Sequence, residues 1–186
     1  RDSALAGFDM ILHATHMDDE ALAVVIDRKV PIVPTFTFQA NLADYGSAIQ
    51  ASPELQELFR KEIADSAAML RRAFDAGVPL LCGTESGFSL TPYGEWHYRE
   101  LEVFVNELGF SPVEAIKAAT SEAARGLCLY GETGALIEGR LADVIVVRGD
   151  VSQDVTLLAD PANIEHVILD GSIVEPSKPR SRQDPP

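Results

Sequence analysis

Three observations predict an α/β fold: apolar runs alternate with helical patterns, short glycine-punctuated strands follow residue 129, and the composition suits a packed core. The apolar runs at residues 8–15, 30–38 and 78–87 are separated by helical patterns, which is typical of parallel βα units. With 186 residues and 46% hydrophobic content, the chain is long enough to bury a sizeable core.

The first βα unit begins with the apolar run FDMILHAT at residues 8–15, which ends in polar residues. Apolar positions at helical spacing then follow Asp18, Asp19 and Glu20, whose carboxylates favour the positive end of a helix. The second run, residues 30–38, is β-branched and aromatic, and its two prolines suit the ends of a strand. A strand, a helix and a second strand are therefore predicted in this order.

The middle of the chain carries the clearest helix signals. A loop is predicted for residues 39–51 and a long helix for residues 53–76. Ser52 is the expected N-cap of that helix, a proline follows it in the first turn, and Gly77 ends it. The third strand is predicted at residues 78–87.

Two more helices are predicted at residues 97–108 and 113–129, the second opened by a Ser-Pro start at Ser111. The later segments GALIEGRLADVIVVRGD and IEHVILDGSIVE read as short strands, with Asp170-Gly171 as a hairpin turn. The tail at residues 177–186 has no apolar side chain to bury and is predicted to be disordered.

Composition excludes several classes of protein. The formal charge of -14 and the scattered basic residues argue against binding to nucleic acid or to anionic membranes. No apolar run approaches the roughly 20 residues that a membrane span needs, so a cytoplasmic location is expected. Cys82 and Cys128 stand far apart in apolar stretches, so we expect two buried thiols and neither a disulfide framework nor a cysteine zinc site.

Candidate metal ligands stand where two of the predicted strands end. His13 closes the first strand and Glu85 closes the third, and the carboxyl ends of parallel strands converge on one side of a sheet. An imidazole and a carboxylate are ordinary ligands of a divalent cation, and Gly83 and Gly87 would allow the turn that exposes the carboxylate. Each residue also has a structural alternative, because such a histidine is more often buried in the core and such a carboxylate is more often a turn residue.

Longer segments of the chain resemble the metal-dependent amidohydrolase superfamily, in particular its dipeptidase-like and imidazolonepropionase-like branch. AGFDMILHATHMDDEAL, VPIVPTF and GVPLLCGTESG resemble the segments around the sixth, seventh and eighth strands of that family's barrel. RELEVFVNELGFSPVEAIKAATSEAARGLCLYGETGALIEGRLADVIVV resembles its closing segment, in which helices lead into a small β-sandwich. The likeness spans most of the chain.

This resemblance implies an α/β fold that forms the C-terminal part of a (β/α)8 TIM-type barrel, strands 6 to 8, followed by part of a small β-sandwich. Residues 1–129 would form the partial barrel and residues 130–176 the sandwich strands, followed by the disordered tail. The family's first-strand His-x-His pair has no counterpart, because the four histidines are His13, His16, His97 and His166. The ligands of its fourth and fifth strands are also missing.

The resemblance assigns roles to individual residues. His13 matches the metal-binding histidine of the sixth strand, and Glu85 occupies the eighth-strand position that is normally aspartate, where the carboxylate touches metal and takes a proton from water. In the loop TPYGEWHYREL, Tyr93 and Trp96 stand where related enzymes often have a substrate-contacting histidine and asparagine, and His97 follows as a third substrate-binding candidate. The two aromatics imply a more apolar pocket, unless they simply pack the loop down.

The implied function is a metal-dependent hydrolase of carbon–nitrogen bonds in amide, carbamate, urea or peptide-like small molecules, with one or two divalent ions. Zinc is the expected metal, and manganese or cobalt are alternatives. Because this chain holds part of the site, we expect it to be inactive alone and to need the missing N-terminal barrel half or a homo-oligomer partner. The alternative is a non-catalytic fragment or pseudoenzyme that contributes a structural half of the fold. His16 is expected to have a loop role and not to bind metal.

Overall fold

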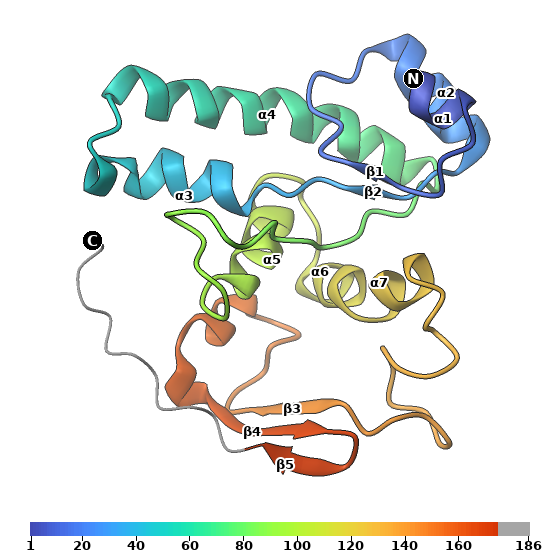
Figure 1. Cartoon of the computed structure of the whole chain (residues 1–186), viewed down its shortest axis with the longest axis vertical. Helices are drawn as coiled ribbons and strands as arrows, with labels where there is room; N and C mark the ends of the chain where they lie inside the picture. The colour runs from blue at the N-terminus through green and yellow to red at the C-terminus, as the bar shows by residue number, and fades with distance from the viewer. Residues whose placement is uncertain (175–186) are drawn as a thin grey trace.

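The computed structural model describes residues 1–174, so the prediction for the tail at 177–186 lies outside the described part. Helices and strands are arranged in separate layers (Figure 1). The elements in chain order are α1 Asp2–Leu5, β1 Ile11–Leu12, α2 Asp19–Arg28, β2 Ile32–Val33, α3 Thr37–Tyr45, the 3-10 helix η1 Gly46–Ile49, α4 Pro53–Asp75, α5 His97–Asn106, α6 Pro112–Ala119, α7 Ser121–Gly126, β3 Val144–Val147, η2 Val155–Ala159, η3 Pro161–Asn163, β4 Ile164–Leu169 and β5 Ser172–Val174.

A short parallel ladder lies at the centre of the N-terminal part. β1 and β2 pair in parallel, with Ile11 opposite Ile32, and Leu80 forms a parallel bridge on the other side of β2. All three predicted strand segments therefore run side by side in the same direction. The third segment, predicted as a strand over residues 78–87, pairs with β2 through Leu80 alone, so it forms an isolated bridge and not an extended strand.

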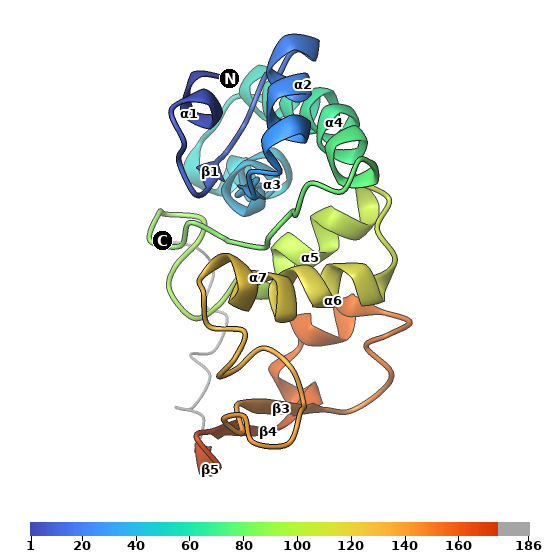
Figure 2. The ribbon, with the colours of Figure 1, turned by 90° about the vertical axis from the view of Figure 1, so that its right-hand side faces the viewer.

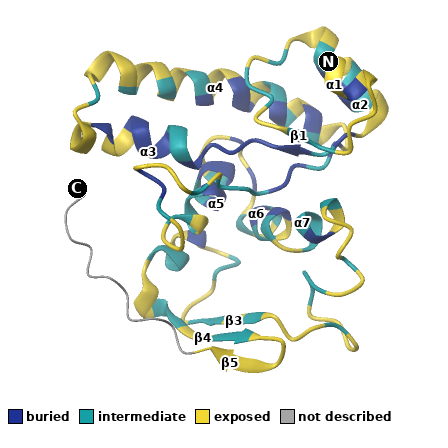
Figure 3. Ribbon diagram, in the orientation of Figure 1, coloured by how far each residue is buried: buried dark blue, intermediate teal, exposed yellow. Residues whose placement is uncertain are grey.

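Helices cover the ladder from both sides, as Figures 1 and 2 show: α4 lies on one side, and α5, α6 and α7 lie on the other. The buried residues concentrate between these layers and along β2 (Figure 3). The largest fully buried apolar side chains come from the ladder and from both helical layers; they are Phe36, Phe104, Ile32, Leu70, Leu80 and Leu108. One core thus spans both helical layers and holds the strand ends in place.

Close packing at one glycine holds the Glu85 loop against β2. A β-carbon on Gly83 would lie 2.5 Å from Val33 Cγ1, a distance that real side chains do not adopt. Any larger residue there would push the loop away from the ladder. Gly83 is therefore required for close packing against Val33 and not for a positive φ angle.

Local capping explains the helix starts that the sequence predicted. The Asp18 side chain accepts the Ala21 backbone N–H, and the Ser52 side chain accepts the Leu55 N–H. At Ser111 a complete capping box forms with the side chain and backbone of Glu114, which satisfies two otherwise unpaired N–H groups. The predicted helix starts are confirmed. They could be predicted because each capping side chain and the N–H group that it accepts from are close in sequence.

The loop predicted for residues 39–51 is wrong, because this segment contains α3 and η1. Phe36 at the N-cap position makes no side-chain cap, so the usual start signal is missing from the sequence. The helix instead buries Ala40, Leu42 and Ala43, and its first N–H groups bond to a side chain distant in sequence. Tertiary packing here outweighs the weak local signal.

The single helix predicted for residues 113–129 is also wrong, since the segment forms α6 and α7 with a break between them. Thr120 has φ -125° and ψ -89°, and its hydroxyl donates to the Ile116 carbonyl at 2.7 Å. A threonine that bonds back to the preceding turn competes with the helical pattern. Cys128, predicted to be buried, lies beyond the end of α7 and is exposed, whereas Cys82 is half-buried.

The C-terminal strands form an antiparallel sheet in the order β3-β4-β5, at the end of the molecule opposite α4 (Figure 1). Asp170 and Gly171 both have positive φ angles, 47° and 74°, as the tight hairpin turn between β4 and β5 requires. The sheet leaves apolar side chains uncovered, with Ile145 54% and Ile173 65% exposed. Within residues 1–174, no helix has the length and apolarity that crossing a membrane requires.

Candidate active site

The fold brings the two predicted metal ligands together. The backbone N–H of His13 donates to the Val33 carbonyl at 2.8 Å, which fixes this residue at the carboxyl end of β1. Glu85 follows the segment that bridges to β2, and its Oε2 lies 3.7 Å from His13 Nε2. The two side chains remain 51% and 43% exposed, so both polar heads are accessible.

Thr35 orients the His13 ring. Its Oγ1 lies 2.6 Å from His13 Nδ1, and the same hydroxyl donates to the Pro34 carbonyl at 2.7 Å. Thr35 is only 7% exposed, so its side of this part-buried contact is shielded from water. With Nδ1 engaged, Nε2 is the ring nitrogen that faces Glu85.

Unusual backbone conformations concentrate at this point. Among the described residues, nine other than glycine have positive φ angles, and His13 (73°), Ala14 (56°), His16 (58°), Thr35 (58°) and Glu85 (49°) belong to this group. A β-branched residue such as Thr35 adopts this region only when its surroundings impose it. Such strain typically gathers at functional sites, where geometry outweighs local preference.

The loop that carries Glu85 is linked to α5. Thr84 Oγ1 lies 2.8 Å from Ser86 Oγ and 3.2 Å from Nδ1 of His97, the first residue of α5. The three polar side chains bracket Glu85 and connect its loop to a helix that the core holds in place. The predicted substrate-binding residue His97 is thus adjacent to the site.

The two aromatic candidates differ in their surroundings. Tyr93 is 81% exposed and lies close to Gly87, where a β-carbon would come within 2.9 Å of the Tyr93 hydroxyl. Trp96 packs between Tyr45 and Tyr98, with ring centroids 5.4 and 5.8 Å away. Tyr93 is therefore free to meet a ligand, and Trp96 belongs to an aromatic cluster.

His16 points to a different partner. Its Nε2 lies 3.8 Å from Oε1 of Glu62 on α4, and its side chain is 67% exposed. The structure shows no contact between His16 and the pair of His13 and Glu85. This arrangement is that of a loop residue paired to a helix.

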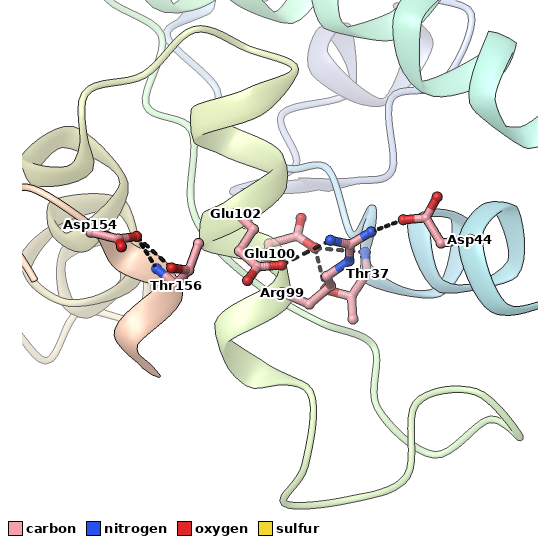
Figure 4. Close-up of polar contacts among 7 residues, drawn as sticks. All are labelled: Thr37, Asp44, Arg99, Glu100, Glu102, Asp154 and Thr156. Carbon is pink, nitrogen blue, oxygen red and sulfur yellow. Dashed lines mark hydrogen bonds and ion pairs between the residues drawn. The ribbon is translucent and has the colours of Figure 1, made fainter. Parts of the chain in front are cut away.

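Sequence reasoning missed Glu100, whose side chain is fully buried on α5 (Figure 4). Its carboxylate accepts the Phe36 N–H at 3.0 Å, the Thr37 N–H at 2.8 Å and the Thr37 hydroxyl at 2.6 Å. Burial raises the pKa of Glu100 to about 7, against the lowering effect of these hydrogen bonds. A signal was present, because Glu100 lies four residues before Phe104 on the apolar face of a predicted helix.

The pair of His13 and Glu85 fits a divalent cation. Zinc binds imidazole nitrogen and carboxylate oxygen at about 2.0–2.2 Å, so atoms about 4 Å apart or closer can share one ion. The separation of 3.7 Å between His13 Nε2 and Glu85 Oε2 meets this condition. Within residues 1–174 no group of three or more His, Cys, Asp or Glu side chains gathers around this pair or elsewhere, so the described part holds no complete metal-binding group.

Fold and site together define an α/β protein with a histidine–carboxylate pair at the carboxyl ends of parallel strands. The sequence profile of the amidohydrolase family matches residues 3–174. The chain belongs to the amidohydrolase family.

Known proteins are similar to most of this chain. Ochratoxinase of Aspergillus niger is 30% identical over 173 residues, which is 90% of this chain and 34% of that enzyme. Among solved structures, a putative prolidase from Bifidobacterium longum has a TM-score of 0.77 and 31% identity, over 92% of this chain and 43% of that one. A Xaa-Pro dipeptidase with bound methionine has a TM-score of 0.75 and 29% identity, over 93% and 41%. The chain therefore spans well under half the length of these relatives.

Proposed function

We propose that this chain contributes to a metal-dependent hydrolase of carbon–nitrogen bonds in amide, carbamate, urea or peptide-like small molecules. The observation that carries the proposal is the separation of 3.7 Å between His13 Nε2 and Glu85 Oε2 at the strand ends. Relatives named ochratoxinase and prolidase support a hydrolytic reaction.

In this proposal residues 1–129 are the last three units of a (β/α)8 barrel, and residues 130–176, of which 130–174 are described, belong to a small β-sandwich. The parallel ladder in the first part and the antiparallel sheet in the second support that division. So does the share of each relative that the chain covers, 34% of ochratoxinase and 43% of the putative prolidase.

His13 and Glu85 would hold one of one or two divalent ions, with zinc preferred to manganese or cobalt. A bound cation would supply polarisation of the substrate carbonyl and a lower pKa of bound water. Glu85 would accept the proton of the attacking water and pass it to the leaving nitrogen. Thr84 and His97 hold the Glu85 loop against α5, and Tyr93 provides an exposed aromatic surface for the substrate.

Completion of the site requires a partner in this proposal, either the N-terminal barrel half or a second copy. Exposed apolar side chains on β1 and β5 support this, with Leu12 58% and Ile173 65% exposed. We expect the isolated chain to associate and to hydrolyse no amide until the partner is present. Sedimentation and an amide-hydrolysis assay check both points, and an active monomer contradicts them.

A zinc titration followed by ¹⁵N-histidine NMR tests the metal site. The His13 Nε2 resonance should shift at a lower zinc concentration than that of the exposed His166, and Glu85→Gln should raise the concentration required at least several-fold. His166→Gln is the matched control and should leave the His13 response unchanged. Equal responses of His13 and His166 would contradict a metal site at His13 and Glu85 and would favour the pseudoenzyme alternative. The observation that favours this alternative is Glu85 itself, a glutamate at the position where the family usually has aspartate.

Substrate preference is proposed to lean toward apolar groups, because Tyr93 and Trp96 replace polar residues in the loop before α5. In the assembled enzyme Trp96→Asn should lower the rate on apolar amides relative to polar ones. Unchanged relative rates would show that Trp96 only packs against its aromatic neighbours.

A further inference from the structure

We propose that Thr35, held in place by Glu100, is a positioning residue that fixes His13 in the Nδ1–H tautomer and turns the Nε2 lone pair toward Glu85. The inference rests on the proposed function, because it assigns a supporting residue to the same site. It concerns residues of this chain alone and is testable without metal.

The tautomer follows from counting protons at Thr35. A threonine hydroxyl has one proton to donate, and a carbonyl oxygen can only accept. The Thr35 hydroxyl donates to the Pro34 carbonyl at 2.7 Å, so its oxygen is left to accept. With the Thr35 proton on that carbonyl, the hydroxyl oxygen accepts from His13 Nδ1 at 2.6 Å, which leaves the lone pair of neutral His13 on Nε2.

That tautomer is the one that the proposed site needs. Metal-binding histidines commonly donate their other ring N–H to an oxygen, which fixes both ring orientation and tautomer. Nε2 of His13 lies 3.7 Å from Glu85 Oε2, so in this tautomer the Nε2 lone pair is left for a cation shared with the carboxylate. A tautomer with Nε2–H would place a proton where a cation belongs.

Glu100 explains why Thr35 stays in an unfavourable backbone conformation. Thr35 has φ 58°, and a buried loop in that conformation requires outside restraint. The fully buried Glu100 supplies it by accepting the N–H groups of the two following residues, Phe36 and Thr37, together with the Thr37 hydroxyl. Figure 4 shows Glu100 on α5 directed at Thr37. α5 thus anchors the loop that orients His13.

His97 offers an internal comparison. Its Nδ1 also faces a threonine hydroxyl, at 3.2 Å from Thr84 Oγ1. Thr84 Oγ1, however, also pairs with the Ser86 hydroxyl, where either oxygen can be the donor. Nothing there fixes the direction of the proton, so the restraint at His13 is specific to Thr35 and its carbonyl partner.

Two-dimensional ¹H–¹⁵N NMR of the chain, labelled at histidine and free of metal, tests the proposal. At a pH about two units above the ordinary histidine pKa of roughly 6.5, the parent should show a protonated Nδ1 and an unprotonated Nε2 for His13. Thr35→Val keeps the shape and removes the hydroxyl, so the His13 signals should move toward the average of both tautomers. Thr35→Ser restores the hydroxyl and should restore the parent spectrum.

The parent spectrum alone can overturn the proposal, since a protonated Nε2 on His13 contradicts it whatever the variants do. Identical His13 spectra in Thr35→Val and the parent would remove Thr35 from the positioning role. Glu100→Gln should also shift the His13 signals, and the exposed Glu107→Gln on the same segment is its control. Parent-like His13 signals in Glu100→Gln would contradict the anchoring role of Glu100. The tautomer is measured without metal and zinc binding in a separate titration. A failure of the metal proposal can therefore be told apart from a failure of the tautomer proposal.

Discussion

Replacing Glu100 by glutamine changes one atom in a fully buried polar cluster formed by Glu100 and Thr37. The parent carboxyl accepts the Phe36 N–H through Oε1, and the Thr37 N–H and hydroxyl through Oε2. A glutamine keeps one carbonyl oxygen, which can serve both Thr37 donors, and presents an NH₂ group to the Phe36 N–H. One buried donor then faces another donor and loses its partner.

The expected loss is about 1–3 kcal/mol of unfolding free energy, the usual effect of leaving a buried donor unsatisfied. Glu100→Gln should also remove the part of the pH dependence of the unfolding free energy that comes from the Glu100 carboxyl. Because burial raises the pKa of Glu100 from 4.5 to about 7 in the fold, the folded chain holds a proton in this range that the unfolded chain releases. Its stability contribution is full below pH 4.5 and is lost as the pH rises through about 7, a change on the order of 3 kcal/mol.

Urea unfolding followed by circular dichroism at several pH values between about 4 and 8 measures both effects. Glu100→Gln should be less stable than the parent near pH 5, and the two should converge as the pH rises. Glu107→Gln, at the exposed C-cap residue that follows α5, should follow the parent throughout. Parallel curves of stability against pH for Glu100→Gln and the parent would show that the buried carboxyl is not protonated on folding. Equal stability of the two proteins at pH 5 would refute the argument that the Phe36 N–H loses its partner.

Three further predictions test packing, capping and exposure. Gly83→Ala should lower the unfolding free energy by about 1–3 kcal/mol in the same assay, because its β-carbon has no room, whereas Gly131→Ala, with open space around it, should not. Ser111→Ala should cost about 1 kcal/mol through loss of the capping box, and full stability would show that the cap is dispensable. A thiol reagent should modify the exposed Cys128 rapidly and the half-buried Cys82 much more slowly, because burial raises the pKa of the Cys82 thiol; equally rapid modification of both would contradict this.

Much of the secondary structure could be predicted from the sequence, because the determining groups are neighbours along the chain. Ser52 and Ser111 cap helices through N–H groups three residues away, and Asp170-Gly171 closes a hairpin between adjacent strands. The parallel order of the N-terminal segments also followed from the alternation of strand and helix patterns. In the site, His13 and Glu85 could be named because both end strand-like runs.

The sequence by itself therefore determined the local elements and the residue types at the strand ends. Only the tertiary structure decided that α3 is a helix, because its first N–H groups bond to Glu100, which lies 63 residues from Thr37 in sequence. It also decided that His13 and Glu85 meet at 3.7 Å and that Thr35 orients the ring. These contacts join segments that are distant along the chain, and their hydrogen bonds become possible only after the core has brought α5 and the strand ends together.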